Sequence, residues 1–289
     1  MPKRKEQHMS DDESEGSSDE SIVQLDFDFF SPQPIDFQAF HRLLVQLFQS
    51  DAEPLHLRDL ADLVISQGHV GSTVKLDGEE SDPLAMLSVV NMRVHAENPA
   101  VRAIGEYVLS KTSADAAFHK TLHGLLSGET GHDVGLILSE RLINMPVQII
   151  PPMWKMLGQE IQGAADEGQP FQFSHFLVVS RTYRAPADGD DPMNGELAPP
   201  SKRSKMSKKR SAGGVAGASL TYPYHEEDTL ISQISSQTLD YPFTNALPRE
   251  DGGFGLDMGG RVMLFEAARF QEVVAALEKE FPPPTAGVS

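Results

Sequence analysis

The chain has 289 residues, an apolar fraction of 39% and a formal net charge of −18 at pH 7. It contains no cysteine, which excludes disulfide scaffolds, thiolate metal sites and cysteine nucleophiles. No apolar run approaches the roughly 18 residues of a membrane span, and residues 1–10 lack the apolar stretch of a signal peptide. We therefore expect a protein of the cytosol or nucleus without direct membrane contact.

The N-terminal segment 1–20 is predicted to be a disordered acidic tail, because 11–20 hold six acids and no apolar residue. We predict that these acids bind a basic partner protein, here called the client: Asp11, Asp12, Glu13, Glu15, Asp19 and Glu20. Ser10 and Ser17 each precede a glutamate by three residues, so we predict that an acid-directed kinase phosphorylates them. A plain solubilising tail is the alternative.

Apolar and polar residues alternate over 23–29, which predicts a half-buried strand. Asp36 is the expected N-cap of a helix whose apolar residues recur through 37–47. A second helix is predicted at 57–67, and Gly68 is expected to end it. This part of the chain should therefore contain one strand followed by two amphipathic helices.

A hairpin is predicted next, with strands at 70–76 and 84–92 and a turn at Asp77-Gly78. Two further helices are expected, one starting at Asn98-Pro99 and one carrying an apolar stripe over 118–126. The central part of the chain is thus predicted to be mainly helical.

The apolar run 134–150 fits either a helix or a strand. Pro151-Pro152 should open a helix that carries Trp154, and the aromatic and β-branched segment 171–183 predicts a central strand. After position 219 we expect short elements at 220–224 and 228–235, a turn around Tyr241-Pro242-Phe243, a strand at 261–266, and a last amphipathic helix at 270–281.

Residues 185–219 are predicted to be a disordered insertion, because they are rich in Pro, Gly, Ala, Ser, Asp and Lys. Six basic residues lie at its centre: Lys202, Arg203, Lys205, Lys208, Lys209 and Arg210. A nuclear localisation signal is the favoured interpretation. An intramolecular partner for the acidic tail is the next alternative. Nucleic-acid binding is disfavoured, since no aromatic side chains interleave the run and the rest of the chain is acidic.

The ordered segments predict one α/β core, formed by 21–184 and 220–282, with a central mixed sheet flanked by helices. The last residues, 283–289, should form a disordered tail. No phosphate-binding loop, dinucleotide turn or nucleophile elbow occurs, so we expect no catalytic residue and no cofactor. The glycine cluster at 252–260 is interpreted as an irregular loop before a strand.

Two other groups of polar residues resemble sites but are better explained without one. His119 and His123 lie four residues apart on a predicted helix, near His132 and Asp133, yet they lack the glutamate of a metalloprotease motif, and we assign no metal. Asp26 and Asp28 share one face of the first strand. The alternation of polar and apolar residues explains them as the solvent-facing side of that strand.

Two motifs carry a resemblance to a known family. The segment 23–32 (VQLDFDFFSP) and the segment 135–146 (GLILSERLINMP), followed by Pro151-Pro152, resemble the BCCIP family of eukaryotic interacting proteins, in its fungal nuclear-export branch. The block Ser-Glu-Arg-Leu-Ile-Asn-Met-Pro at 139–146 is the most specific element. The layout of acidic start, core, charged insertion and C-terminal helix agrees over nearly the whole chain.

The resemblance implies a core like that of the GNAT (Gcn-five-related) acetyltransferases, without their activity. It also implies a non-enzymatic nuclear escort, able to shuttle to the cytoplasm. The implied partners are a basic ribosomal protein of the large subunit, other protein cargo such as a phosphoinositide kinase, and nuclear transport receptors.

An acetyl-CoA-dependent acetyltransferase is the rival function. Such enzymes seat the cofactor's pyrophosphate on backbone N–H groups at a strand-to-helix turn. The candidate segments do not fit that pattern: 67–71 (QGHVG) has the wrong spacing, and 249–254 (REDGGF) has phenylalanine where a small residue is required.

Overall fold

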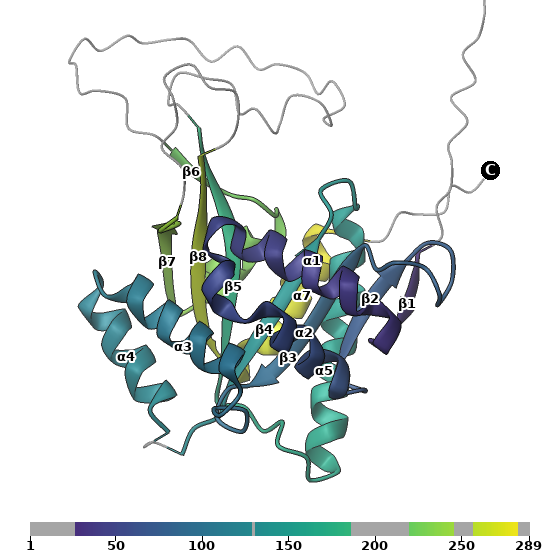
Figure 1. Cartoon of the computed structure of the whole chain (residues 1–289), viewed down its shortest axis with the longest axis horizontal. Helices are drawn as coiled ribbons and strands as arrows, with labels where there is room; N and C mark the ends of the chain where they lie inside the picture. The colour runs from purple at the N-terminus through teal and green to yellow at the C-terminus, as the bar shows by residue number, and fades with distance from the viewer. Residues whose placement is uncertain (1–26, 129–130, 186–219, 246–256, 283–289) are drawn as a thin grey trace, which may run out of the picture.

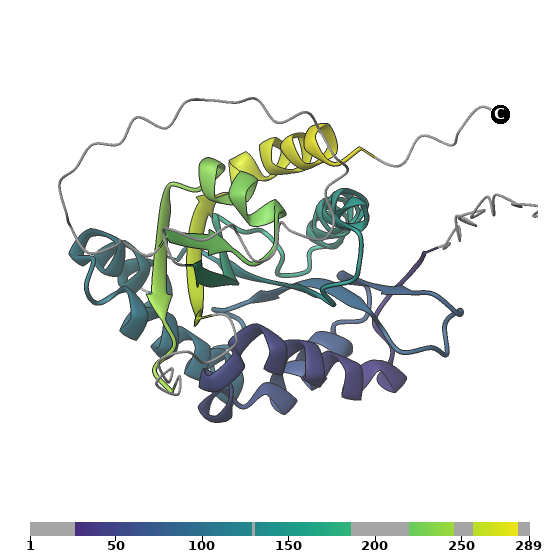
Figure 2. The same cartoon turned by 90° about the horizontal axis from the view of Figure 1, so that it is seen from above.

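The computed structural model describes residues 27–128, 131–185, 220–245 and 257–282, which build one sheet with helices on both faces (Figures 1 and 2). The strands follow the order β1-β2-β3-β4-β5-β8-β7, and β6 pairs with β5 outside that path. Only β4 and β5 are parallel among the described pairs. The predicted α/β class with a mixed central sheet is confirmed, and the sheet is mostly antiparallel.

The strands are β1 (Asp28–Phe30), β2 (Gly71–Lys75), β3 (Ala85–Asn91), β4 (Val134–Arg141), β5 (His175–Ala185), β6 (Leu220–Pro223), β7 (Gln237–Pro242) and β8 (Asp257–Glu266). The helices are α1 (Phe37–Phe48), α2 (Leu57–Ser66), α3 (Pro99–Thr112), α4 (Ala116–Leu126), α5 (Ile150–Asp166), α6 (Glu227–Ile234) and α7 (Phe270–Glu280). Helices α1 to α4 cover one face of the sheet, and α5, α6 and α7 cover the other (Figure 2). None of the helices in these ranges is long and apolar enough to cross a membrane.

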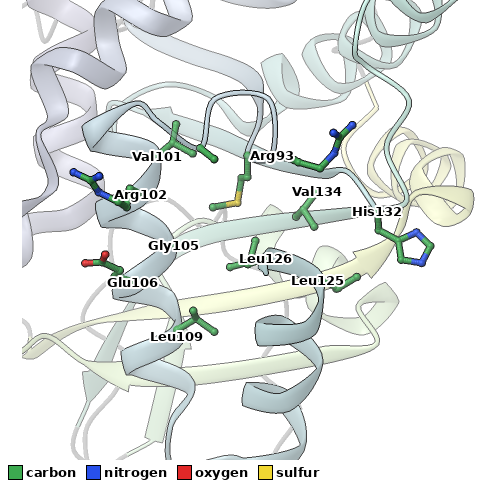
Figure 3. A pocket seen from close by; sticks show the side chains of 12 residues that line it. Arg93, Val101, Arg102, Gly105, Glu106, Leu109, Leu125, Leu126, His132 and Val134 are labelled. Atoms are coloured by element: carbon green, nitrogen blue, oxygen red, sulfur yellow. The ribbon is translucent and has the colours of Figure 1, made fainter. Parts of the chain in front are cut away.

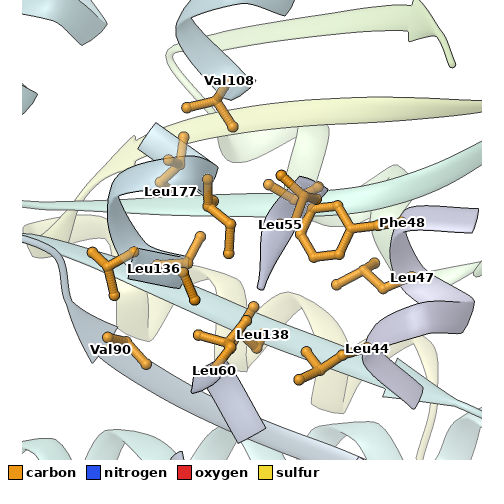
Figure 4. Close-up of a cluster of buried hydrophobic side chains, with 14 of the residues drawn as sticks. Leu44, Leu47, Phe48, Leu55, Leu60, Val90, Val108, Leu136, Leu138 and Leu177 are labelled. Atoms are coloured by element: carbon orange, nitrogen blue, oxygen red, sulfur yellow. The ribbon is translucent and has the colours of Figure 1, made fainter. Parts of the chain in front are cut away.

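Each face of the sheet packs on its own apolar cluster. Residues Leu136 and Leu138 of β4 point into the cluster beneath α1 to α4, whereas Ile137 between them points into the cluster beneath α5 to α7. A strand buried on both faces has a nearly continuous apolar run in place of alternation. This is why the run 134–150 did not distinguish helix from strand; it is strand up to Arg141 and helix from Ile150. Figure 4 shows the cluster beneath α1 to α4.

The helix start and stop signals are confirmed in several places. The Asn98 side chain accepts hydrogen bonds from the backbone N–H groups of Ala100 at 2.9 Å and Val101 at 3.4 Å, which caps α3. Gly68 follows α2 with a φ of 73°, a conformation that glycine adopts without strain. The hairpin of β2 and β3 also forms as predicted.

Three local predictions are wrong. The Asp36 side chain makes no cap on α1; its Oδ1 accepts from Nζ of the buried Lys75 at 2.7 Å instead. Tyr241 and Pro242 belong to β7 rather than to a turn. Gly259 and Gly260 lie within β8 rather than in a loop. The Tyr241 ring of β7 occupies the space that a side chain on Gly260 would need, which explains the glycine at that position.

Candidate functional site

The sheet contains an opening between its two parallel strands. The register of β4 and β5 ends at the pair Ile137 and Val178, although β4 continues to Arg141 and β5 to Ala185. Strand β8 pairs with β5 along nearly its whole length, so β4 and β6 share the other edge of β5. Strand β6 takes over that edge where β4 leaves it. The segment that contains β6 and α6 therefore covers the opening.

Glu140 of β4 lies at the centre of this opening, with a relative exposure of 1%. Its carboxylate accepts hydrogen bonds from the Arg181 guanidinium at 2.8 and 3.0 Å and lies 2.7 Å from Nε2 of His225. It also accepts from the Gln46 side chain of α1 and from the backbone N–H of Arg141, both at 3.0 Å. One buried carboxylate thus joins α1, β4, β5 and the segment after β6.

A second ion pair fastens α6 to β4. The Arg141 guanidinium donates to both carboxylate oxygens of Glu227 at 3.2 and 3.0 Å, and its Nη1 donates to the carbonyl oxygen of Met145 at 2.7 Å. The Arg181 guanidinium carbon lies 3.7 Å from the centroid of the Tyr224 ring. We call these six side chains, Glu140, Arg141, Arg181, Tyr224, His225 and Glu227, the ionic network.

The electrostatics of the network match its pairing. Burial alone would raise the pKa of Glu140, but hydrogen bonds and charge from His225 and Arg181 hold that pKa below its usual range. Burial opposes the charge on His225, yet its bond to Glu140 and the neighbouring acids raise its pKa above the usual value. Both groups are therefore stabilised in their charged forms.

The network is better suited to holding structure than to chemistry. The charged side chains of its two ion-pair groups are 5% exposed or less. A general base or nucleophile must reach its substrate directly or through one water molecule, and these groups are engaged with one another. The arrangement fastens the segment over the opening to β4 and β5.

A second buried cluster ties α3 to the end of β7. Asp51 accepts hydrogen bonds from the backbone N–H groups of Thr244 and Asn245 at 3.0 and 2.9 Å, and its Oδ2 lies 2.7 Å from Nζ of Lys111. Burial would raise the pKa of Asp51, but Lys111 and the two N–H groups lower it. The Lys111 ammonium lies 5.1 Å from the ring centroids of both Tyr107 and Tyr241.

A cavity of about 200 Å³ lies between α3 and α4 (Figure 3). Most of its lining is apolar: Met92, Val101, Leu109, Leu125, Leu126 and Val134. The polar residues Arg93, Arg102, Glu106 and His132 also line it. Gly105 of α3 also faces it, and a side-chain carbon there would come within 3.8 Å of Met92.

Most of the residues singled out from the sequence lie outside the described ranges. These are the six acids of the tail, Ser10, Ser17, Asp26 and the basic run 202–210. Asp28 is exposed on β1. The rings of His119 and His123 are 6.3 Å apart, and Nδ1 of His119 lies 3.0 Å from the carbonyl oxygen of Leu109. Within the described ranges, no three His, Cys, Asp or Glu side chains are placed to hold a metal ion.

Comparison with known proteins identifies the family. A model of the BCCIP family matches residues 22–231. The chain belongs to the BCCIP family. A BCCIP relative from Schizosaccharomyces pombe, named Protein bcp1, is 40% identical over 265 residues, covering 90% of each chain. Protein bcp1 of Emericella nidulans is 36% identical over 279 residues, covering 92% of this chain and 91% of its own.

The fold of this BCCIP chain is also found in a solved structure. The crystal structure of BCP1 from Saccharomyces cerevisiae has a TM-score of 0.60 and 23% identity, and the match covers 92% of this chain and 93% of the other. The BCCIP match extends through β6 into α6, so it includes the segment over the opening.

The block at 139–146, on which the BCCIP resemblance mainly rested, supplies two members of the ionic network. Glu140 and Arg141 are its acidic and basic residues, and Met145 contributes the carbonyl oxygen that accepts from Arg141. The sequence reasoning missed Arg181, His225 and Glu227. Their one signal was charge: Arg181 lies inside the aromatic and β-branched segment 171–183, and His225 and Glu227 lie in the polar run after Tyr224.

Proposed function

We propose that this protein is a non-enzymatic escort that binds basic client proteins. Membership of a family named for interaction with other proteins supports the proposal. The observation that carries it is the charge: outside 201–210, which holds six of the 24 basic residues, 18 basic residues face 42 acidic ones. Such a surface attracts basic proteins at long range and speeds their association.

The described part of the core contributes to that charge. Asp77, Glu79, Glu80 and Asp82 are all exposed in the connection between β2 and β3. Only Asp82 has an ion-pair partner within the described ranges, at 2.7 Å from the exposed Arg42. In the proposal, this hairpin and the tail acids of 11–20 share the first, electrostatic stage of client capture.

The proposal extends to clients and compartment. We propose that the clients include a ribosomal protein of the large subunit and export cargo such as a phosphoinositide kinase, with nuclear transport receptors as further partners. The run 202–210 would serve as the nuclear localisation signal, and Ser10 and Ser17 as phosphorylation sites that deepen the negative charge of the tail.

We further propose that the fold resembles that of the GNAT acetyltransferases, without acetyl transfer. In open α/β sheets, ligands bind beyond the carboxyl ends of parallel strands where neighbouring strands separate. Here that place lies between β4 and β5, and Glu140, Arg181 and His225 occupy it. A cofactor would have to displace this network, which favours the binding function over the acetyltransferase.

A binding assay with purified large-subunit ribosomal proteins tests the proposal. The full chain should bind one or more of them. The affinity should fall steeply as salt rises from about 50 to about 300 mM, because the added ions screen the attraction between exposed charges. A chain without residues 1–20 should bind at least about threefold more weakly, because part of the attracting charge is gone.

An unrelated protein of the same size and net charge is the matched control. Binding no stronger than this control would overturn the proposal. Calorimetry with acetyl-CoA addresses the rival directly, since micromolar binding would favour an enzyme.

A further inference from the structure

The segment 220–234, which we call the latch, covers the opening in the sheet through polar contacts. Four residues of strand β6 pair with the C-terminal end of β5, on the edge that β4 leaves. Beyond it, His225 contacts Glu140, and Glu227 pairs with Arg141. Apolar residues Ile231 and Ile234 pack beneath α7 on the other side of α6. The side of the latch that faces β4 and β5 is therefore fastened by charged groups.

Asp228 occupies an unusual position in this latch. It is 4% exposed, directly follows Glu227, and its Oδ2 accepts no hydrogen bond within the described ranges. The charged and titratable groups that act on it come from three packed elements: Arg141 of β4, His225 and Glu227 of the latch, and Arg261 of β8, which is itself paired with Asp240 of β7. The hydroxyl of Ser180 in β5 also faces it.

Ionisation of Asp228 would place a second carboxylate beside that of Glu227, in a site that excludes water. Burial raises the pKa of Asp228 to about 7, and the charge of Glu227 acts in the same direction. His225, Ser180 and Arg261 oppose this rise without cancelling it. The neutral form thus fits the closed latch, whereas the charged form is better accommodated in water.

We infer that the latch is proton-sensitive: it holds the opening closed when Asp228 carries a proton and loosens when that carboxyl ionises. The two guanidinium groups beside Asp228, those of Arg141 and Arg261, are already paired with Glu227 and Asp240, so ionised Asp228 would share its countercharges with other carboxylates. Loosening would uncover the edge of β5 at Thr182–Ala185, where β6 pairs in the closed form.

The direction of the pH response follows from linkage. The pKa of Asp228 is raised in the closed latch, so the stabilisation is complete below the ordinary pKa of an aspartate and is lost as pH rises toward 7. The raised pKa of His225 affects stability in the same direction, because its contribution is also lost as pH rises through that pKa. The pKa of Glu140 is lowered, so its contribution to stability changes in the opposite direction and is lost as pH falls below the ordinary value of 4.5. The closed form should therefore be most stable near about pH 5.

Hydrogen exchange on the full chain tests the latch. Protection factors, corrected for the intrinsic rate at each pH, should fall about tenfold in peptides of α6 between about pH 5.5 and 7.5. Peptides of α3, which lies on the other face, should change by less than about threefold. The substitution Asp228→Asn keeps the shape and removes the ionisation, so it should remove most of the response in α6.

Asp62→Asn, the same change at an exposed position on α2, is the matched control and should leave the α6 response as in wild type. Equal pH responses in α6 and α3 of the wild-type chain would overturn the inference, even if Asp228→Asn fails to fold. A folded Asp228→Asn chain that keeps the wild-type response would overturn it as well.

Discussion

Two regions of this molecule close their interiors by different physical means. Beneath α1 and α2 the interior is an apolar cluster in which Leu44 and Leu60 are fully buried (Figure 4). At the opening between β4 and β5 the interior is ionic, with Glu140 contacting two cationic side chains. Both regions exclude water, yet only the second depends on which charge meets which partner.

This difference separates stability from specificity. Apolar burial is non-directional and contributes roughly in proportion to area, so many side-chain combinations fill such a cluster. A buried ion pair gains little over an apolar pair, but it becomes very costly when one partner is lost. We therefore expect the apolar region to tolerate changes of shape and the ionic region to tolerate few changes of charge.

The largest effect is expected from Glu140→Gln. The amide keeps the shape but leaves Arg181 and His225 without their countercharge, which should lower the free energy of unfolding by about 3–5 kcal/mol. Urea denaturation at pH 7 measures it. Glu278→Gln removes one partner of an exposed ion pair with Lys155 and should cost less than about 1 kcal/mol. Equal losses in the two variants would contradict the comparison.

A slightly smaller loss is expected from Leu44→Ala. Its side chain is fully buried beneath α1, so the cavity left behind should cost about 3 kcal/mol. The loss should be the same at pH 6 and pH 8, because no titratable group is involved. The neighbouring Val45→Ala, at a side chain that is 39% exposed, serves as the control and should cost far less.

A double-mutant cycle on the Arg141–Glu227 pair should give a coupling free energy of about 2 kcal/mol. Arg141→Met and Glu227→Met each strand one buried charge, whereas the double variant has neither and should recover part of the loss. Additive losses would show that the pair is not a unit. A loss in the double variant as large as in the single variants would contradict the view that charge matching, rather than volume, governs this region.

The smallest effect is expected from Asp228→Asn, measured as stability against pH. At pH 8 the variant should be more stable than wild type by about 1 kcal/mol, since it avoids burying a second carboxylate beside Glu227. Below about pH 4, where this carboxyl is protonated in both the folded and the unfolded chain, the two proteins should be equally stable. A variant less stable than wild type at pH 8 would contradict the prediction.

Sequence reasoning predicted the elements whose signals are local. The helix at 57–67 and the helix start at Asn98-Pro99 were found because periodicity and capping depend on neighbours along the chain. The role of Asp36 was mistaken, since its partner Lys75 lies on β2 and no local pattern indicates it. Lys75 itself is fully buried in β2.

The candidate site was predicted only in part for the same reason. The block at 139–146 indicated the family, but nothing in it shows that Glu140 meets Arg181 and His225, which are 41 and 85 positions away. Such pairings depend on the separation of two parallel strands. The glycines Gly259 and Gly260 were read as a loop because their need for space comes from Tyr241 on the neighbouring strand.

The pairing of Ala185 with Leu220 has a consequence for how this chain can vary in length. These residues end β5 and begin β6, so both ends of the segment 186–219 leave the sheet side by side on one antiparallel ladder. The entropy of closing a loop on such a stem grows only with the logarithm of its length. Related chains can therefore gain, lose or exchange residues between these two positions, including the basic run, at little cost to the core that the ladder anchors.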